Sequence, residues 1–227
     1  MTASLPDTST RSPQWHKWAR VCFGATAACV LAGVVINAIT AADNNGGHFH
    51  PAAARAANTF AFFTTWSNLL VGLGTLLLAV RLDRSSTAFA VLRLSGLVAI
   101  ISTGVATGVG FEFAQTHHLK GWAAVWNVLL HTVVPVMAVV GWLLFGPRRI
   151  VSRRVAWLSV IFPVCYLAFT LIRGAIVHWY PYAFIDVTQL GYGRAALNCV
   201  PIPLFTLGLA ASATVLDRWL GRATSVA

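Results

Sequence analysis

Six long apolar segments, separated by short polar connections, constrain the fold of this chain more than any other feature. They cover approximately residues 21–41, 59–80, 88–111, 123–145, 155–177 and 194–216. Each is close to the roughly 20 residues that an α-helix needs to cross the hydrocarbon core of a bilayer. Because backbone polar groups in lipid must bond within their own segment, each segment is predicted to be a helix. We therefore predict an all-α, polytopic membrane protein whose six transmembrane helices form one bundle.

The composition agrees with a chain surrounded mostly by lipid. Of the 227 residues, 57% are hydrophobic and 10% are charged, and the mean hydropathy is +0.72. Soluble globular proteins carry about a quarter charged residues. We predict a polar N-terminal tail over residues 1–16, a transmembrane domain over residues 17–220 and a C-terminal tail over residues 221–227.

The first apolar segment has two interpretations. It follows Arg11, Lys17 and Arg20 and ends at the small residues of Thr40-Ala41-Ala42, a pattern that also fits a cleaved signal peptide. The run is long for the apolar part of a signal peptide, so we favour a retained first helix.

The basic residues predict the orientation of the bundle. Twelve of the 16 lysines and arginines lie on the side of the two chain ends, and the other four are Arg55, Lys120, Arg173 and Arg194. Cytoplasmic loops carry an excess of such residues, so we expect both termini to be cytoplasmic. This topology explains the net charge of +10 without a nucleic-acid partner. The preference for arginine over lysine and the abundance of alanine favour a bacterial plasma-membrane protein.

One apolar segment contains a group of polar residues that points to a functional site. His131 lies well inside the fourth segment, one helical turn after Asn127 and one turn before Pro135. An ionisable side chain within a membrane span is expensive and needs a reason. Because Pro135 has no N–H, the carbonyl of His131 loses its helical partner and the helix is expected to bend there. We therefore predict a site around His131 and Asn127.

Other segments carry polar side chains at helical spacing near the same predicted depth. Residues three or four apart share one face of a helix. The second segment presents Thr64, Ser67 and Asn68, the fifth Tyr166, Thr170 and Arg173, and the sixth Arg194 and Asn198. We expect these faces to enclose a cavity in the outer half of the membrane.

Each of these residues also has a purely structural interpretation. A membrane threonine usually bonds a carbonyl of its own helix, and Ser67 and Asn68 are typical of contacts between helices. Arg173 and Arg194 can extend to the outer headgroups. The four cysteines lie in apolar segments and read as small buried residues. The pairs His48/His50 and His117/His118 lack accompanying cysteines or carboxylates, so we expect neither a metal nor another cofactor.

Several function classes are disfavoured by what the sequence lacks. There is no Gly-x-Ser-x-Gly elbow, no P-loop and no His-Glu-x-x-His motif. The six acidic residues lie at or beyond the ends of the apolar segments. Proton-coupled transport usually needs a buried carboxylate, so a transporter is disfavoured.

The polar strings resemble the androgen-induced family of membrane proteins. Its eukaryotic members hydrolyse fatty acid esters of hydroxy fatty acids with a membrane-embedded threonine and histidine. The similarity rests on Phe62-Phe63-Thr64, Asn127-x-x-x-His131-Thr132-x-x-Pro135 and Tyr180-Pro181, and Trp66-Ser67-Asn68 with Tyr180-Pro181-Tyr182-x-Phe184-x-Asp186 is similar to its bacterial six-helix branch. The resemblance implies Thr64 as nucleophile and His131 as base, with Tyr180 and Asp186 as supporting residues. The family's histidine-rich stretch is not matched, since Arg173 stands near that position, and Thr65 remains an alternative nucleophile.

Two functions follow as hypotheses. The first is a Thr64/His131 hydrolase of a lipid ester drawn from the membrane, with Asn127 orienting the histidine and Asn68 or Arg173 stabilising the oxyanion. The second is a non-enzymatic membrane protein that binds a lipid or a partner, or carries a small solute.

Overall fold

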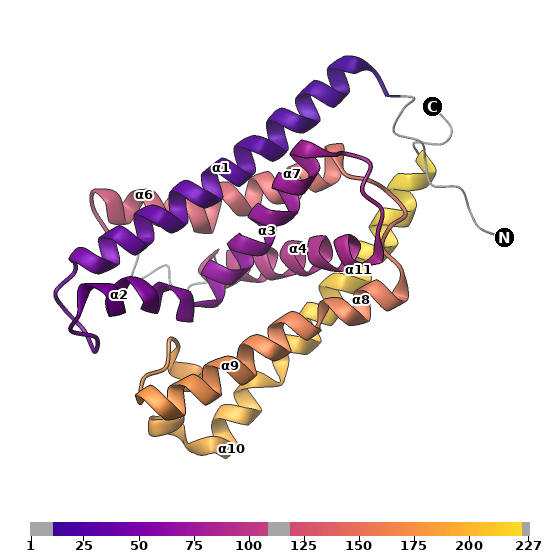
Figure 1. The fold of residues 1–227 in the computed structure, drawn as a ribbon. Coiled ribbons are helices and arrows are strands. Elements are labelled where there is room, and N and C mark those ends of the chain that lie inside the picture. Colours follow the sequence, from indigo (N-terminus) through magenta and orange to yellow (C-terminus); the bar gives the residue numbers. More distant parts are fainter. Residues whose placement is uncertain (1–10, 109–118, 224–227) are drawn as a thin grey trace.

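The computed structural model describes residues 11–108 and 119–223, and helices make up most of this part (Figure 1). The α-helices are α1 (Pro13–Asp43), α2 (Ala52–Asn58), α3 (Phe63–Val80), α4 (Thr87–Gly108), α6 (Trp122–Val128), α7 (Val134–Phe145), α8 (Arg153–Ser159), α9 (Ile161–Val177), α10 (Val187–Cys199) and α11 (Pro201–Ala223). Three short helical turns join them, at η2 (Thr59–Ala61), η3 (Leu129–Val133) and η4 (Ala183–Ile185).

Six of the helical stretches are long and apolar enough to cross a membrane. They are Pro13–Asp43, Phe63–Val80, Thr87–Ala106, Trp122–Phe145, Arg153–Val177 and Val187–Arg222. The six-helix prediction is confirmed, with boundaries that differ mainly at the first and last spans, which are both longer than expected. Residues 109–111 of the third predicted span lie outside the described residues. The last span is interrupted at Gly191, whose φ of 72° breaks the helical backbone.

The core lies where α1, α3, α4 and α7 pack together, and α8 and α11 pack on another side of α4 (Figure 1). One apolar cluster joins the first four helices through Val30, Val71, Ile100, Val134 and Ala138. A second joins α4 to α8 and α11 and is formed by Ala90, Leu94, Val98, Val151, Val155, Ala156 and Ala210. Helix α4 therefore belongs to both packing units.

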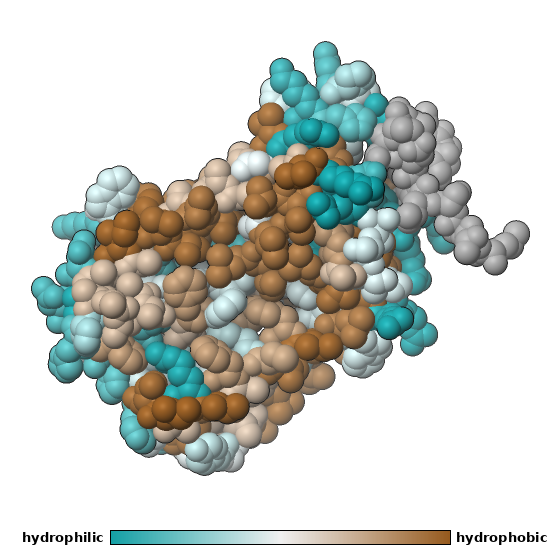
Figure 2. Space-filling model, viewed as in Figure 1, coloured by the Kyte–Doolittle hydropathy of each residue, from teal (hydrophilic) through white to brown (hydrophobic). Residues whose placement is uncertain are grey.

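The surface of the bundle is apolar around its waist and polar toward its ends (Figure 2). Large apolar side chains that point outward include Leu31, Leu73, Val136, Ile172 and Leu204. Such a surface is stable against lipid rather than water, which agrees with a multi-pass membrane protein.

Small residues allow the helices of the core to approach closely. A Cβ atom on Gly96 of α4 would lie 3.2 Å from backbone atoms of Leu70 and Val71 in α3. By contrast, a Cβ atom on Gly24 of α1 would have no neighbour within 4 Å. Contacts of this kind replace the hydrophobic effect as a source of helix association in lipid.

We expect Gly96→Leu to destabilise the protein by about 1–3 kcal/mol, because a leucine there displaces the backbone of α3. Gly24→Leu is the matched control and should leave the free energy of unfolding nearly unchanged. Unfolding of both purified variants in detergent, followed by circular dichroism, measures the difference. Equal stabilities would contradict the close α3–α4 contact.

Candidate functional site

A cavity of about 320 Å³ lies at the end of the bundle opposite the described chain ends. Side chains from α1, α2, η2, α3, α6 and η3 line it. They are Asn37, Ala41, Arg55, Asn58, Thr59, Phe62, Thr64, Thr65, Leu119, Trp126, Asn127 and His131. The structure thus brings Thr64, Asn127 and His131, which the sequence proposes for chemistry, to one cavity.

The helix that carries His131 changes its hydrogen-bonding pattern at this depth. Residues Leu129–Val133 form a π-helical turn, in which the N–H of Val134 donates to the carbonyl of Leu129. Pro135 follows after Val134 and has no N–H to donate, so the regular α-helical hydrogen bonding cannot continue through it. A π-turn inside an α-helix widens the backbone and is frequent at functional sites. Here it carries His131, which is only 8% exposed, to the cavity wall.

Asn127 contacts the imidazole of His131 with both its backbone and its side chain. The Nδ1 atom of His131 lies 3.2 Å from the Asn127 carbonyl oxygen and 3.3 Å from Asn127 Nδ2. If Nδ1 carries the proton and donates it to the carbonyl, the other ring nitrogen, Nε2, is the basic nitrogen of the neutral ring. The ring of Trp126 lies beside it, with centroids 6.1 Å apart. Asn127 therefore holds the orientation of the ring, and its carbonyl matches the tautomer with Nε2 as base, whereas its Nδ2 matches the opposite tautomer.

The two adjacent threonines differ in their hydrogen bonds. The buried Thr65 donates its hydroxyl to the carbonyl of Thr59 at 2.7 Å, which fixes η2 against α3. The hydroxyl of Thr64 lines the cavity and has no hydrogen bond to any residue within the described ranges. Of the two, Thr64 is therefore the one whose hydroxyl is available for a reaction.

Asn68 and Ser67 support this wall from behind. The amide nitrogen of Asn68 donates to the carbonyls of Thr64 at 2.8 Å and Leu130 at 3.1 Å, so it ties α3 to the π-turn. Ser67 donates to the carbonyl of Thr64 and contacts the hydroxyl of Thr103 at 3.1 Å. Both N–H bonds of Asn68 are already used and its side chain is outside the cavity lining, so we assign it no role toward an oxyanion.

The remaining predicted residues do not line the cavity. Arg173 donates to Asn58 Oδ1 at 2.7 Å and its guanidinium lies over the rings of Phe49 and Trp179. Arg173 therefore contacts the cavity lining only through Asn58. Arg194 is exposed on α10.

Tyr180, Asp186 and Asn198 hold the α9–α10 connection together. Tyr180 packs its ring on Gly174, and burial raises the pKa of its phenol. Asp186 caps α10 by accepting from the N–H of Thr188 at 3.0 Å. Asn198 donates to the carbonyl of Phe184 at 2.9 Å. Each has local partners that account for its presence.

Arg55 is the lining residue that the sequence reasoning assigned only to the outer side. Its Nε atom donates to the carbonyl of Ala41 at 3.3 Å, its Nη2 to that of Ala42 and to Asn45 Oδ1, and its Nη1 to that of His50. An arginine at the C-terminal end of a helix satisfies carbonyls that have no helical partner. Arg55 thereby holds α2 under the end of α1. Arg55 is the one charged residue in the alanine-rich stretch 52–57, which marks it in the sequence. No sequence spacing, however, predicts its contact with the end of α1.

The residues that the structure describes include no group of three or more histidine, cysteine or acidic side chains placed to share a metal ion. His117 and His118 lie outside these residues. The lining offers hydroxyls, amides, one imidazole and one guanidinium, a set suited to acyl chemistry or to binding a polar headgroup.

Comparison with models of protein families, with curated proteins and with solved structures gives no match for this chain.

We expect Thr65→Val to lower the free energy of unfolding by about 1 kcal/mol, because the buried bond to the Thr59 carbonyl is lost while the side-chain shape is kept. Thr64→Val should change it by less than about 0.5 kcal/mol, since no hydrogen bond to a described residue is removed. Chemical unfolding in detergent micelles compares the two. A larger loss in Thr64→Val would mean that its hydroxyl has a structural role.

Proposed function

We propose that the chain is an intramembrane hydrolase of lipid esters, with Thr64 as nucleophile and His131 as general base. The observation that carries the proposal is that both side chains, from α3 and from the π-turn, line one cavity together with Asn127. The resemblance to the androgen-induced family, in which a threonine and a histidine hydrolyse fatty acid esters of hydroxy fatty acids, supports the same pair.

The chemistry divides ester hydrolysis into two steps. Nε2 of His131 takes the proton of the Thr64 hydroxyl as its oxygen attacks the ester carbonyl carbon. The C–O bond to the alcohol then breaks, and the proton on His131 goes to the leaving alcohol, which leaves the acyl group on Thr64. A water molecule, deprotonated by His131, cleaves this acyl-threonine, the acid departs and Thr64 recovers its proton.

The lining also offers donors for the charge that develops on the carbonyl oxygen. The side chains of Asn37 and Asn58 line the cavity and each carries an amide N–H₂. Amide donors fixed in a site with little water stabilise an oxyanion strongly. Arg173 donates a hydrogen bond to Asn58 Oδ1 and so holds that amide in one orientation. In this proposal Asn37 and Asn58 take the role that the sequence assigned to Asn68 or Arg173.

The character of the cavity favours a lipid-like ester over a soluble one. Phe62, Leu119 and Trp126 give it apolar walls, while Arg55 supplies the positive charge. Its volume of about 320 Å³ is near the lower end of the range for small-molecule sites, so it holds an ester group and part of one chain, with the rest in lipid. With the termini in the cytoplasm, the site lies in the outer half of a bacterial plasma membrane.

A second candidate is a protein that binds a lipid in the same cavity without reaction. The observation that favours it is that no hydrogen bond joins Thr64 to His131, although catalytic contacts are often longer in sites without substrate. A solute carrier is less favoured, because no carboxylate lines the cavity within the described residues.

Hydrolysis of a fatty acid ester of a hydroxy fatty acid by the purified protein tests the first proposal. We expect Thr64→Ala to abolish release of the fatty acid and His131→Gln to slow it by at least about 10²-fold, because general-base assistance contributes that much. Thr64→Ser should remain active, since it keeps a hydroxyl. Thr132→Ala is the matched control, because Thr132 belongs to the same π-turn but is exposed. Undiminished hydrolysis by Thr64→Ala would contradict the proposal.

Labelling with a fluorophosphonate separates the two candidates without knowledge of the substrate. The probe reacts with an activated hydroxyl and not with an inert one. We expect labelling of the native protein and of Thr132→Ala, and loss of labelling in both Thr64→Ala and His131→Ala. Retention of a bound lipid by a protein that is never labelled would favour the binding function instead.

A further inference from the structure

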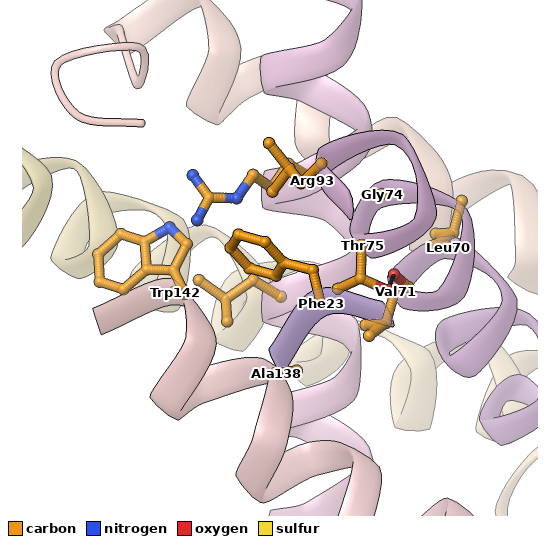
Figure 3. Close-up of a pocket in the computed structure, with 10 residues that line it drawn as sticks. Phe23, Leu70, Val71, Gly74, Thr75, Arg93, Ala138 and Trp142 are labelled. Atoms are coloured by element: carbon orange, nitrogen blue, oxygen red, sulfur yellow. Dashed lines mark hydrogen bonds between the residues drawn. The ribbon is translucent and has the colours of Figure 1, made fainter. Parts of the chain in front are cut away.

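A second, much smaller hollow lies toward the other end of the bundle, between α1, α3, α4 and α7 (Figure 3). Its volume is about 30 Å³, and most of its walls are apolar, including Phe23, Leu78 and Leu97. The exceptions are Arg93 of α4, Trp142 of α7 and Thr75 of α3, whose hydroxyl donates to carbonyls of its own helix. Figure 3 shows the guanidinium of Arg93 and the indole of Trp142 beside each other at one end of this hollow.

Both side chains carry N–H groups without an acceptor among the described residues. Arg93 donates from Nη1 to the carbonyl of Pro147 at 3.2 Å, but its Nη2 is buried and unpaired. This nitrogen packs against Gly146, where any side chain would collide with it. Trp142 is 5% exposed, and no hydrogen bond joins its indole N–H to a described residue. The buried Nη2 of Arg93 calls for an acceptor, because an unpaired buried donor is costly, and the indole N–H of Trp142 lies beside it.

The charges around the hollow also favour an anion, because the positive groups outnumber the negative ones. The guanidinium of Arg148 lies over the ring of Trp142 at 5.3 Å, and its Nη1 is also buried and unpaired. The carboxylate that interacts with these arginines is that of Asp217, which is fully buried. Its Oδ2 accepts from the N–H of Val151 at 3.1 Å, whereas its Oδ1 has no described partner. Burial lowers the pKa of Arg148, and Asp217 acts in the opposite direction.

These groups do not neutralise one another. Within residues 11–108 and 119–223, the ion pair with oxygen and nitrogen in contact is the exposed one between Arg81 and Asp83. Two guanidinium groups and one carboxylate therefore leave an excess positive charge in a region of low dielectric constant. An uncompensated buried charge is strongly destabilising, so a counter-ion has a large effect there.

We propose that the hollow between Arg93 and Trp142 binds a small monovalent anion of the halide class. The N–H groups of Arg93 Nη2 and of the Trp142 indole bind the ion directly, and Arg148, whose guanidinium lies over the Trp142 ring, adds attraction. The volume of about 30 Å³ is room for one or two water molecules, which suits a small ion better than a phosphate or a lipid headgroup. The bound ion joins α4 to α7 and to the connection that begins at Gly146, at the end of the bundle opposite the large cavity. This site is independent of the proposed hydrolase.

The thermal stability of the full chain in detergent, dialysed into sodium gluconate and titrated with bromide, tests the proposal. We expect the Tm to rise with bromide and to saturate, with a total shift of about 3–6 °C, because a ligand that binds the folded state stabilises it. Arg93→Gln and Trp142→Phe should each lose most of this shift. Trp142→Phe keeps a ring in place, so it carries the test if Arg93→Gln does not fold. Arg81→Gln, at an exposed arginine on the same end, should keep the full shift.

Bromide soaked into crystals of the protein locates the ion directly by its anomalous scattering. A peak within hydrogen-bond distance of Arg93 Nη2 and Trp142 Nε1 is the expected result. The proposal is overturned if the Tm is the same in gluconate and bromide, or if both Arg93→Gln and Trp142→Phe keep the shift. A water molecule in the hollow without any bromide peak overturns it equally.

Discussion

The exclusion of water from the hydrocarbon core is the constraint on which the rest of this structure depends. Every backbone N–H and carbonyl at that depth must find a partner within the protein, and regular helices satisfy almost all of them. The regular helical hydrogen bonding is interrupted at Pro135, which has no N–H. The residues just before it, Leu129–Val133, form a π-helical turn. The candidate site is built where the regular pattern is interrupted.

The interruption also determines how the site is held together. The amide of Asn68 spans from the carbonyl of Thr64 on its own helix to that of Leu130 in the π-turn. One buried side chain thus fixes the relative position of the two helices that carry Thr64 and His131. The histidine is in turn oriented by Asn127 one turn earlier. The candidate reactive groups are therefore positioned by bonds that do not themselves face the cavity.

Polar groups gather at two levels of the bundle, and their chemistry differs. Around the large cavity, Arg55 gives its donors to backbone carbonyls at the end of α1, so its charge is balanced by a helix terminus. Around the small hollow, Arg93 and Arg148 keep unpaired nitrogens, and the single carboxylate of Asp217 faces two guanidinium groups. The first arrangement is structurally complete without a ligand, whereas the second leaves buried donors unpaired.

The sequence alone determined the class of protein, the six spans and the unusual backbone near Pro135, because hydropathy, segment length and the missing proline N–H are local properties. It also predicted a similar depth for Thr64 and His131, and the two residues line one cavity together with Asn127. Depth and helical spacing assign a residue to a level and a face, but not to the direction in which that face points within the bundle. For this reason Arg173 and Asn198 met the same criteria and yet lie outside the cavity. Tyr180 and Asp186, which only the resemblance implied, lie outside it as well. Only the tertiary structure decided that α2 folds back under α1, that Asn37, Arg55 and Asn58 complete the lining, and that Asn68 serves the framework, since these depend on contacts between segments distant in sequence.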